Sequence, residues 1–197
     1  MTETIVNDEA LDVIFRDART RNGWEDRPIA ATLLQAVYDL MKWGPTSANC
    51  FPARFVFVSS AEGKEQLRPF LMEGNVEKTM SASACVIIGN DMEFYEKLPE
   101  LSPHTDAKSW FVGNDELIAE TAMRNGSLQG AYFMIAARAL GLDCGPMSGF
   151  DKAGVDKAFF GGTSVQSNFL CNIGYGTDKE LFDRSPRPDF DEVCSII

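Results

Sequence analysis

Histidine and paired cysteines are scarce in this chain of 197 residues. The one histidine, His104, lies in a proline-containing segment typical of a solvated loop, so a mechanism that needs several imidazoles has no support. The five cysteines form no C-x-x-C pair, and no G-x-S-x-G, Walker or H-E-x-x-H motif is present. These absences argue against covalent hydrolases, nucleotide triphosphatases and metalloenzymes. We expect no disulfide and no bound metal.

Long apolar runs and net positive charge are also lacking. No run approaches the length of a membrane span, and residues 1–9 are acidic where a secretory signal would be basic. The formal net charge of −11 repels nucleic acid and anionic membrane surfaces. We therefore expect a cytoplasmic protein with no nucleic-acid or membrane partner. Because no linker or low-complexity tract divides the chain, we interpret residues 1–197 as a single domain.

Hydrophobic periodicity predicts a chain of mixed helices and strands. Apolar residues at helical spacing, with helix-capping signals, predict helices over 11–18, 33–41, 62–71, 116–140 and 151–159, the first of them capped near Asn7 or Asp8. Runs of β-branched and aromatic residues predict strands over 54–58, 84–88 and 169–176. The middle of the longest helix is apolar on nearly every face, which predicts a central, buried helix. Residues 92–114 lack periodicity and are expected to be irregular, with short helical pieces. Residues 142–150 are interpreted as a strand-to-helix turn.

A polar loop follows the second predicted helix. Pro45 ends that helix, and Thr46, Ser47 and Asn49 then offer three short side chains that both donate and accept hydrogen bonds. Such a loop can hold a polar ligand. Equally, these side chains can serve the backbone of the turn itself.

Two basic clusters stand out in this acidic chain. Arg19, Thr20 and Arg21 follow the first predicted helix, and Arg184 and Arg187 lie near the end. Guanidinium forks and hydroxyls match phosphate oxygens, although cations at a helix end also offset the helix dipole. Both interpretations of the first cluster remain open.

Two further groups of residues could meet a planar ligand. Asn75 and Lys78 are spaced to share one helical face, although exposed Asn and Lys are usually just solvated. Gly145, Pro146 and Gly149 would let a flat ligand approach the backbone, although an ordinary strand-to-helix turn explains the same residues. Taken together with the basic clusters and the polar loop, they suit an anionic cofactor with a phosphate tail and a planar head better than a side-chain nucleophile.

Longer runs of residues carry more information than these short motifs. A helix, P-T-S-A-N-x-F-P at 45–52, a strand, G-L-D-x-x-P-x-x-G-F at 141–150 and a basic tail follow one another over almost the whole chain. This order resembles the nitroreductase family of flavin enzymes. Within that family, the runs at 18–24, 42–49 and 94–99 are similar to the malonic semialdehyde reductase branch of pyrimidine catabolism.

The resemblance implies an α+β fold with a central, mainly antiparallel sheet flanked by helices, a long buried helix and an intertwined homodimer. FMN would lie at the subunit interface. Two departures from the family pattern are Phe51, where many members have Gln, and Ser148, where many have a carboxylate. The FMN-binding residues implied in this way are Arg19, Thr20, Arg21, Asn75, Lys78, Pro146, Ser148, Gly149, Arg184 and Arg187 of one subunit, with Pro45, Thr46, Ser47 and Asn49 of the other.

The same resemblance implies a ping-pong reaction. NADH or NADPH would deliver a hydride to the flavin and leave, and a small aldehyde, malonic semialdehyde, would then accept the hydride to give 3-hydroxypropionate. Lys78 would stabilise the anionic reduced ring, and Ser47, water or an FMN hydroxyl would supply the proton. The alternatives are a broad nitro or quinone reductase and a flavin-binding protein without turnover.

Overall fold

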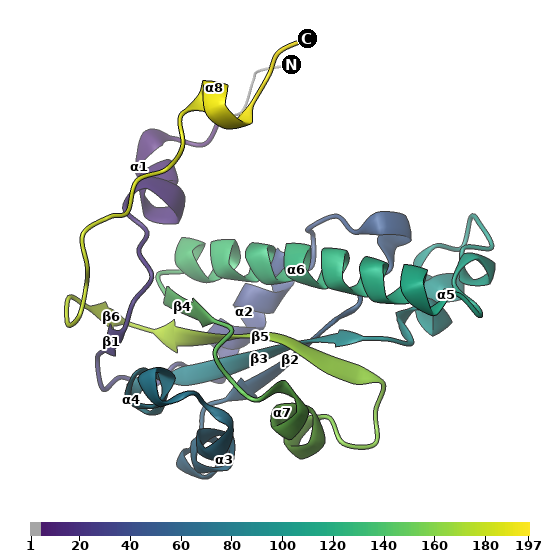
Figure 1. Ribbon diagram of the computed structural model, residues 1–197. Helices are drawn as coiled ribbons and strands as arrows, with labels where there is room; N and C mark the ends of the chain where they lie inside the picture. Colours follow the sequence, from purple (N-terminus) through teal and green to yellow (C-terminus); the bar gives the residue numbers. More distant parts are fainter. Residues whose placement is uncertain (1–4) are drawn as a thin grey trace.

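In the computed structural model, which describes residues 5–197, a four-stranded antiparallel sheet lies between layers of helices (Figure 1). The strands of this sheet pair in the order β2-β3-β5-β4, and a separate pair joins β1 to β6. The predicted α+β fold with an antiparallel sheet flanked by helices is confirmed. The strands are β1 (Gly23–Trp24), β2 (Ala53–Val58), β3 (Ala84–Asp91), β4 (Asp143–Met147), β5 (Val165–Gly174) and β6 (Gly176–Thr177).

The helices match most of the predicted ones. They are α1 (Asp8–Leu11), α2 (Ala31–Met41), α3 (Ala61–Leu67), α4 (Glu73–Ser81), α5 (Leu98–Leu101), α6 (Asp115–Ala139), α7 (Lys152–Phe159) and α8 (Phe190–Val193). A π-helical segment, Asp12–Arg16, continues α1, so the first predicted helix begins where its cap was expected and ends at Arg16, sooner than expected. Its N-cap is Asn7, whose side chain accepts from the backbone N–H of Ala10. Residues 1–4 of the acidic start lie outside the described residues.

The central strand β3 shows how the two helical layers meet the sheet. Side chains alternate between the faces of a strand. Val86 and Ile88 pack with α2 and α6, whereas Cys85 and Ile87 pack with α3 and α7. All four are fully buried. A strand covered on both faces reads as a continuous apolar run, which is why its position is evident in the sequence.

The long helix α6 is present as expected, but its burial is one-sided. Phe133 and Ala137 pack against the sheet and are fully buried. On the outer side, Met123, Leu128 and Tyr132 are 47%, 44% and 38% exposed. The helix lies across one face of the sheet (Figure 1), and on its outer side the chain around Gly44 meets Tyr132. The expected burial therefore holds for the face of α6 that meets the sheet, whereas Leu128 on the outer side is exposed.

Residues 92–114 agree with the structure expected from the sequence, whereas residues 142–150 differ from it. Residues 92–114 contain the expected short helical pieces, and Phe94 and Phe111 pack against Ile118 near the start of α6. Residues 142–150 form more than the expected turn, because they include the strand β4. Pro146 is tolerated within β4 because this is an edge strand that pairs only with β5.

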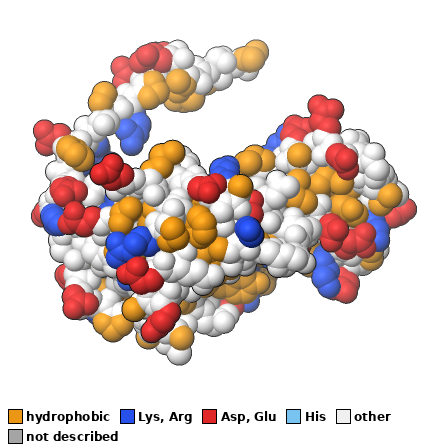
Figure 2. All heavy atoms as spheres, turned by 60° about the horizontal axis from the view of Figure 1, so that its bottom comes forward, with side chains coloured by type: hydrophobic (Ala, Val, Ile, Leu, Met, Phe, Trp, Pro, Cys, Tyr) orange, Lys and Arg blue, Asp and Glu red, His pale blue; other side chains and the backbone are white. Residues whose placement is uncertain are grey.

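The two ends of the chain leave the body of the molecule together (Figures 1 and 2). Arg184 joins them by donating from Nη2 to the carbonyl of Arg16 at 2.6 Å. Phe182, Phe190 and Val193 of the C-terminal segment are all more than half exposed. The segment therefore presents apolar surface that the single chain does not cover. Among residues 5–197, no helix has both the length and the hydrophobicity needed to cross a bilayer.

Candidate functional site

Arginines gather around a cavity of about 590 Å³ between residues 18–22, the end of α6 and residues 181–187. Four arginines line the cavity: Arg19, Arg138, Arg184 and Arg187. Among the described lining residues, Asp183 supplies the one carboxylate. Their guanidinium groups donate to backbone carbonyls, and within residues 5–197 none of the four forms an ion pair. The cavity is therefore strongly electropositive.

Arg138 has spare hydrogen-bonding capacity at this cavity. Its Nε is buried and has no hydrogen-bond partner within the described chain. A buried donor without a partner costs free energy, and a phosphate oxygen would satisfy it. Thr20 and Asn22 add a hydroxyl and an amide to the lining. The chemistry of this donor set fits a phosphate group.

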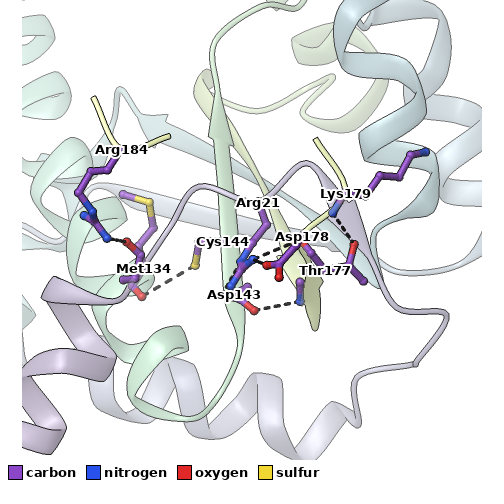
Figure 3. A network of polar contacts seen from close by, with 10 residues as sticks. Arg21, Met134, Asp143, Cys144, Thr177, Asp178, Lys179 and Arg184 are labelled. Atoms are coloured by element: carbon purple, nitrogen blue, oxygen red, sulfur yellow. Dashed lines mark hydrogen bonds and ion pairs between the residues drawn. The ribbon is translucent and has the colours of Figure 1, made fainter. Parts of the chain in front are cut away.

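Arg21 does not line the cavity, although the sequence places it beside Arg19. Its Nη1 donates to Asp178 at 2.6 Å and to the carbonyl of Thr177 at 3.2 Å, and its Nε lies 3.5 Å from Asp143 (Figure 3). Its side chain is only 18% exposed. Two carboxylates therefore pair with Arg21, which joins β4 to β6, and its predicted contact with the phosphate stays a prediction.

A second group of predicted residues meets where α4 lies beside the end of β4. Asn75 of α4 donates from Nδ2 to the carbonyl of Gly149 at 2.7 Å. A Cβ added to Gly149 would lie 2.7 Å from that same nitrogen, so the position has no room for a side chain. Pro146 lies in β4, and Ser148 is exposed just after it. The absence of a side chain at Gly149 therefore lets α4 pack closely against the end of β4 and brings Asn75 beside Pro146 and Ser148.

Lys78 brings an unpaired charge to this group. It is half-buried, and within residues 5–197 its ammonium forms no ion pair and no hydrogen bond. The neighbouring carboxylate of Glu77 pairs with Lys179 at 2.7 Å, and the hydrogen bond from Lys179 lowers the pKa of Glu77. Glu77 is therefore matched by another cation, which leaves the charge of Lys78 available to a ligand.

The strand β4 connects the cavity to the second group. Thr20 forms a bridge with Cys144 near the start of β4, and Gly149 follows its end. An extended chain rises about 3.3 Å per residue, so residues 144 and 149 lie about 16 Å apart. A long ligand with a phosphate at one end and a polar planar ring at the other fits this arrangement. FMN has this chemistry.

The polar loop lies elsewhere in the single chain. Asn49 donates from Nδ2 to the carbonyl of Leu101 at the end of α5 at 2.7 Å, and α5 and α4 lie at opposite ends of the molecule (Figure 1). Pro45, Ser47 and Asn49 are exposed, and Thr46 is half-buried. The structure therefore does not bring this loop to the other predicted flavin-binding residues within one chain.

Cys50, which follows the loop, is not poised for chemistry. It is buried, and desolvation raises the pKa of its thiol to about 11. The thiol is therefore protonated near neutral pH and is a poor nucleophile.

The family model described as "Nitroreductase family" matches residues 6–175. This range includes Arg19 and Arg138 of the cavity, the whole of β4 and the polar loop. This chain belongs to the nitroreductase family. A Burkholderia lata protein provisionally named NADH dehydrogenase/NAD(P)H nitroreductase is 61% identical over 193 residues, which cover 98% of this chain and 99% of that protein. The expected family is confirmed, whereas the malonic semialdehyde reductase branch stays a prediction.

Solved structures share the nitroreductase fold at low sequence identity. One from Exiguobacterium sibiricum, described as a nitroreductase in complex with FMN, has a TM-score of 0.86 at 19% identity and covers 100% of both chains. One from Staphylococcus epidermidis, described as an NAD(P)H:FMN oxidoreductase, has a TM-score of 0.83 at 22% identity, covering 100% of this chain and 99% of that one. At these identities the likeness establishes the fold.

Sequence reasoning missed Arg138 in this nitroreductase-family chain. Arg138 lies in the last turn of α6, where a cation is commonly explained by the helix dipole. The useful signal was its place in an otherwise apolar stretch, since a charge there needs a partner. Only the tertiary structure places it beside Arg19 and Arg184.

Proposed function

We propose that this nitroreductase-family chain is an FMN-dependent oxidoreductase that uses NADH or NADPH to reduce a small electrophile, with malonic semialdehyde as the favoured substrate. The observation that carries the proposal is the unpaired positive charge at both ends of β4. Four arginines without carboxylate partners among residues 5–197 surround the cavity at one end, and Lys78 stands unpaired at the other. Names of similar proteins support it, since relatives are called NAD(P)H nitroreductases and one structural neighbour is described with FMN.

Each end of the strand has a defined task in this proposal. Arg19, Arg138 and Arg184 would hold the phosphate through charge-assisted hydrogen bonds. Asn75 and Gly149 would lie against the ring, and the hydrogen bond from Asn75 to the carbonyl of Gly149 holds the two together. When bound, FMN supplies the hydride chemistry that no side chain of this protein can perform.

Lys78 would act electrostatically. Its ammonium is fixed on α4, half-buried and free of a carboxylate within the described chain. A positive charge held in place stabilises negative charge on the ring without moving a proton. The hydroxyl of Ser47 is exposed and offers a proton to an alkoxide product.

We also propose that the protein is a homodimer whose second subunit supplies the polar loop. Pro45, Thr46, Ser47 and Asn49 cannot meet the ring site of their own chain, because they lie near α5 at the far end of the molecule. Exposed large apolar side chains occur on α2, on the outer side of α6 and on the two ends of the chain. By contrast, α3 and α7, on the other face of the sheet, carry none among the described residues. A groove of about 400 Å³ between α2 and the edge strand β2 has aromatic walls that suit such an apolar segment from another copy.

Spectroscopy and rapid kinetics test the function. The purified chain is expected to be yellow, to lose its flavin colour with NADH or NADPH, and to regain it on mixing with the true oxidant in a stopped-flow instrument. Comparison of malonic semialdehyde, a nitroaromatic and a quinone separates the favoured substrate from the alternative of a broad reductase, which the names of relatives favour. A chain that binds no FMN would contradict the proposal. Reduction without reoxidation by any electrophile would indicate a flavin-binding protein.

A further inference from the structure

The loop assigned to the flavin contains an unusual concentration of left-handed backbone. Ala48, Asn49 and Phe51 have φ values of 50°, 53° and 45°, and they are three of the four non-glycine residues with positive φ among those described. Residues with a Cβ adopt this region only when surrounding contacts hold them there. The loop therefore needs contacts from other elements of the chain to hold its backbone in this conformation.

Two buried amides on α6 provide that support. The Oδ1 of Asn125 accepts from the backbone N–H of Ser47 at 2.8 Å, and the Oε1 of Gln129 accepts from the backbone N–H of Ala53 at 2.8 Å. Asn125 is 0% and Gln129 1% exposed. The two bonds bracket the left-handed residues, one on each side.

The two acceptors follow from the helix itself. Residues four apart lie on the same face of a helix, so Asn125 and Gln129 reach the same loop. Asn125 donates its own Nδ2 to the carbonyl of Thr121 at 2.8 Å, which turns its oxygen toward Ser47. Three positions after Gln129, Tyr132 meets the start of the loop, because a Cβ added to Gly44 would lie 2.6 Å from the ring.

We propose that Asn125 and Gln129 are positioning residues, which hold the 45–52 loop in the shape that presents Ser47 and Asn49 to the flavin of a second subunit. This inference rests on the proposed function, because it takes the loop to be a flavin-binding element. Neither amide touches the cofactor. Each acts through the backbone of the loop. Removal of the Gln129 acceptor leaves the buried N–H of Ala53 without a partner, removal of the Asn125 acceptor frees the N–H of Ser47, and either change releases the left-handed residues.

The Gln129 side chain allows a matched test. Gln129→Met keeps the length of the side chain and removes the acceptor, whereas Gln129→Glu keeps an oxygen acceptor. Within the described chain the Nε2 of Gln129 has no hydrogen-bond partner, so the Glu variant loses no hydrogen bond. Because the site is buried, the introduced carboxyl group must be protonated to be tolerated, and both Gln129 variants are therefore compared with the unmodified chain at about pH 5.5, where burial keeps this group neutral. Gln129→Met is expected to raise the Kd for FMN at least tenfold and to alter the visible circular dichroism of the bound flavin. Gln129→Glu is expected to stay within threefold of the unmodified chain.

Hydrogen exchange supplies a measurement on the loop itself. In Gln129→Met, and in Asn125→Leu, the backbone amides of 46–51 and of Ala53 in the full-length chain are expected to exchange at least tenfold faster than in the unmodified protein. Gln129→Glu is expected to restore slow exchange. Should Asn125→Leu fail to fold, the two Gln129 variants still decide the inference.

Asn168 provides a control. It is a buried amide of β5 that donates to Ser127 of α6 at 3.1 Å and forms no hydrogen bond with the loop. Asn168→Leu is expected to lower the denaturation midpoint while FMN affinity and loop exchange stay within twofold. Equal weakening of FMN binding by Asn168→Leu and Gln129→Met would overturn the inference. So would unchanged FMN affinity in Gln129→Met. An unmodified chain that binds no FMN would instead overturn the proposed function.

Discussion

At the scale of single residues, charge pairing separates the arginines that can bind a ligand from those that hold the fold. Arg21 meets Asp143 and Asp178, so its charge is satisfied within the chain. Arg19 and Arg138 face the cavity without a carboxylate partner among residues 5–197. Spacing in the sequence groups Arg21 with Arg19, but the position of carboxylates in space assigns them to different tasks.

Arg19→Ala should therefore weaken FMN binding, whereas Arg21→Ala should mainly weaken the fold. A hydrogen bond to a charged group contributes about 1.5–3 kcal/mol, so Arg19→Ala is expected to raise the Kd for FMN by roughly 10- to 100-fold. Arg21→Ala breaks partly exposed ion pairs and is expected to lower the free energy of unfolding by about 1 kcal/mol. Equilibrium dialysis and urea denaturation measure the two effects. Strong loss of FMN in Arg21→Ala at unchanged stability would contradict this division.

At the scale of elements, α6 works as a support for the site because glycines let it approach the sheet closely. A Cβ at Gly126 would lie 1.9 Å from Oδ1 of Asn90 in β3, and one at Gly130 would lie 2.5 Å from the ring of Phe169 in β5. Both glycines are buried. Glycine usually destabilises a helix. At these two positions a larger residue would destabilise the protein more, because its side chain would push the helix away from the sheet.

Gly126→Ala is expected to destabilise the protein by about 1–3 kcal/mol, despite the better helix propensity of Ala, because the buried side chain of Asn90 would have to shift to make room. The matched control is Gly74→Ala in α4, where a Cβ would meet nothing within 4 Å. That change is expected to be neutral or to stabilise by up to about 1 kcal/mol. Urea denaturation of both variants checks the prediction, and a stabilising effect of Gly126→Ala would refute the close packing described here.

At the scale of the whole molecule, the divided site and the exposed apolar surface both favour assembly with a second copy of the chain. Ring-binding and phosphate-binding residues lie along β4, whereas the polar loop lies near α5 at the other end (Figure 1). The outer side of α6 exposes Leu128 and Tyr132, and the C-terminal segment stands away from the body (Figure 2). A second copy that covers these surfaces would also complete the site, so cofactor binding and assembly would be coupled.

Leu128→Asp tests this coupling. A carboxylate in an apolar interface pays the full cost of desolvation, so the variant is expected to be a monomer at micromolar concentration and to retain FMN poorly. Ala153→Asp, on an exposed position of α7, is the control and is expected to leave both properties unchanged. Analytical ultracentrifugation with detection at the flavin absorbance reports both. A dimer of normal FMN content in Leu128→Asp would contradict the proposed interface.

The sequence by itself determined the features that depend on neighbouring residues. The apolar run of β3, the periodicity of α2 and α6 and the composition of the polar loop are local, and each is found where it was predicted. Only the tertiary structure decided which charges are paired. It separated Arg21 from Arg19, added Arg138 to the cavity and placed Asn125 and Gln129 under the loop. Each of these outcomes depends on a partner distant in sequence, because hydrogen bonds and ion pairs form between groups that folding brings together.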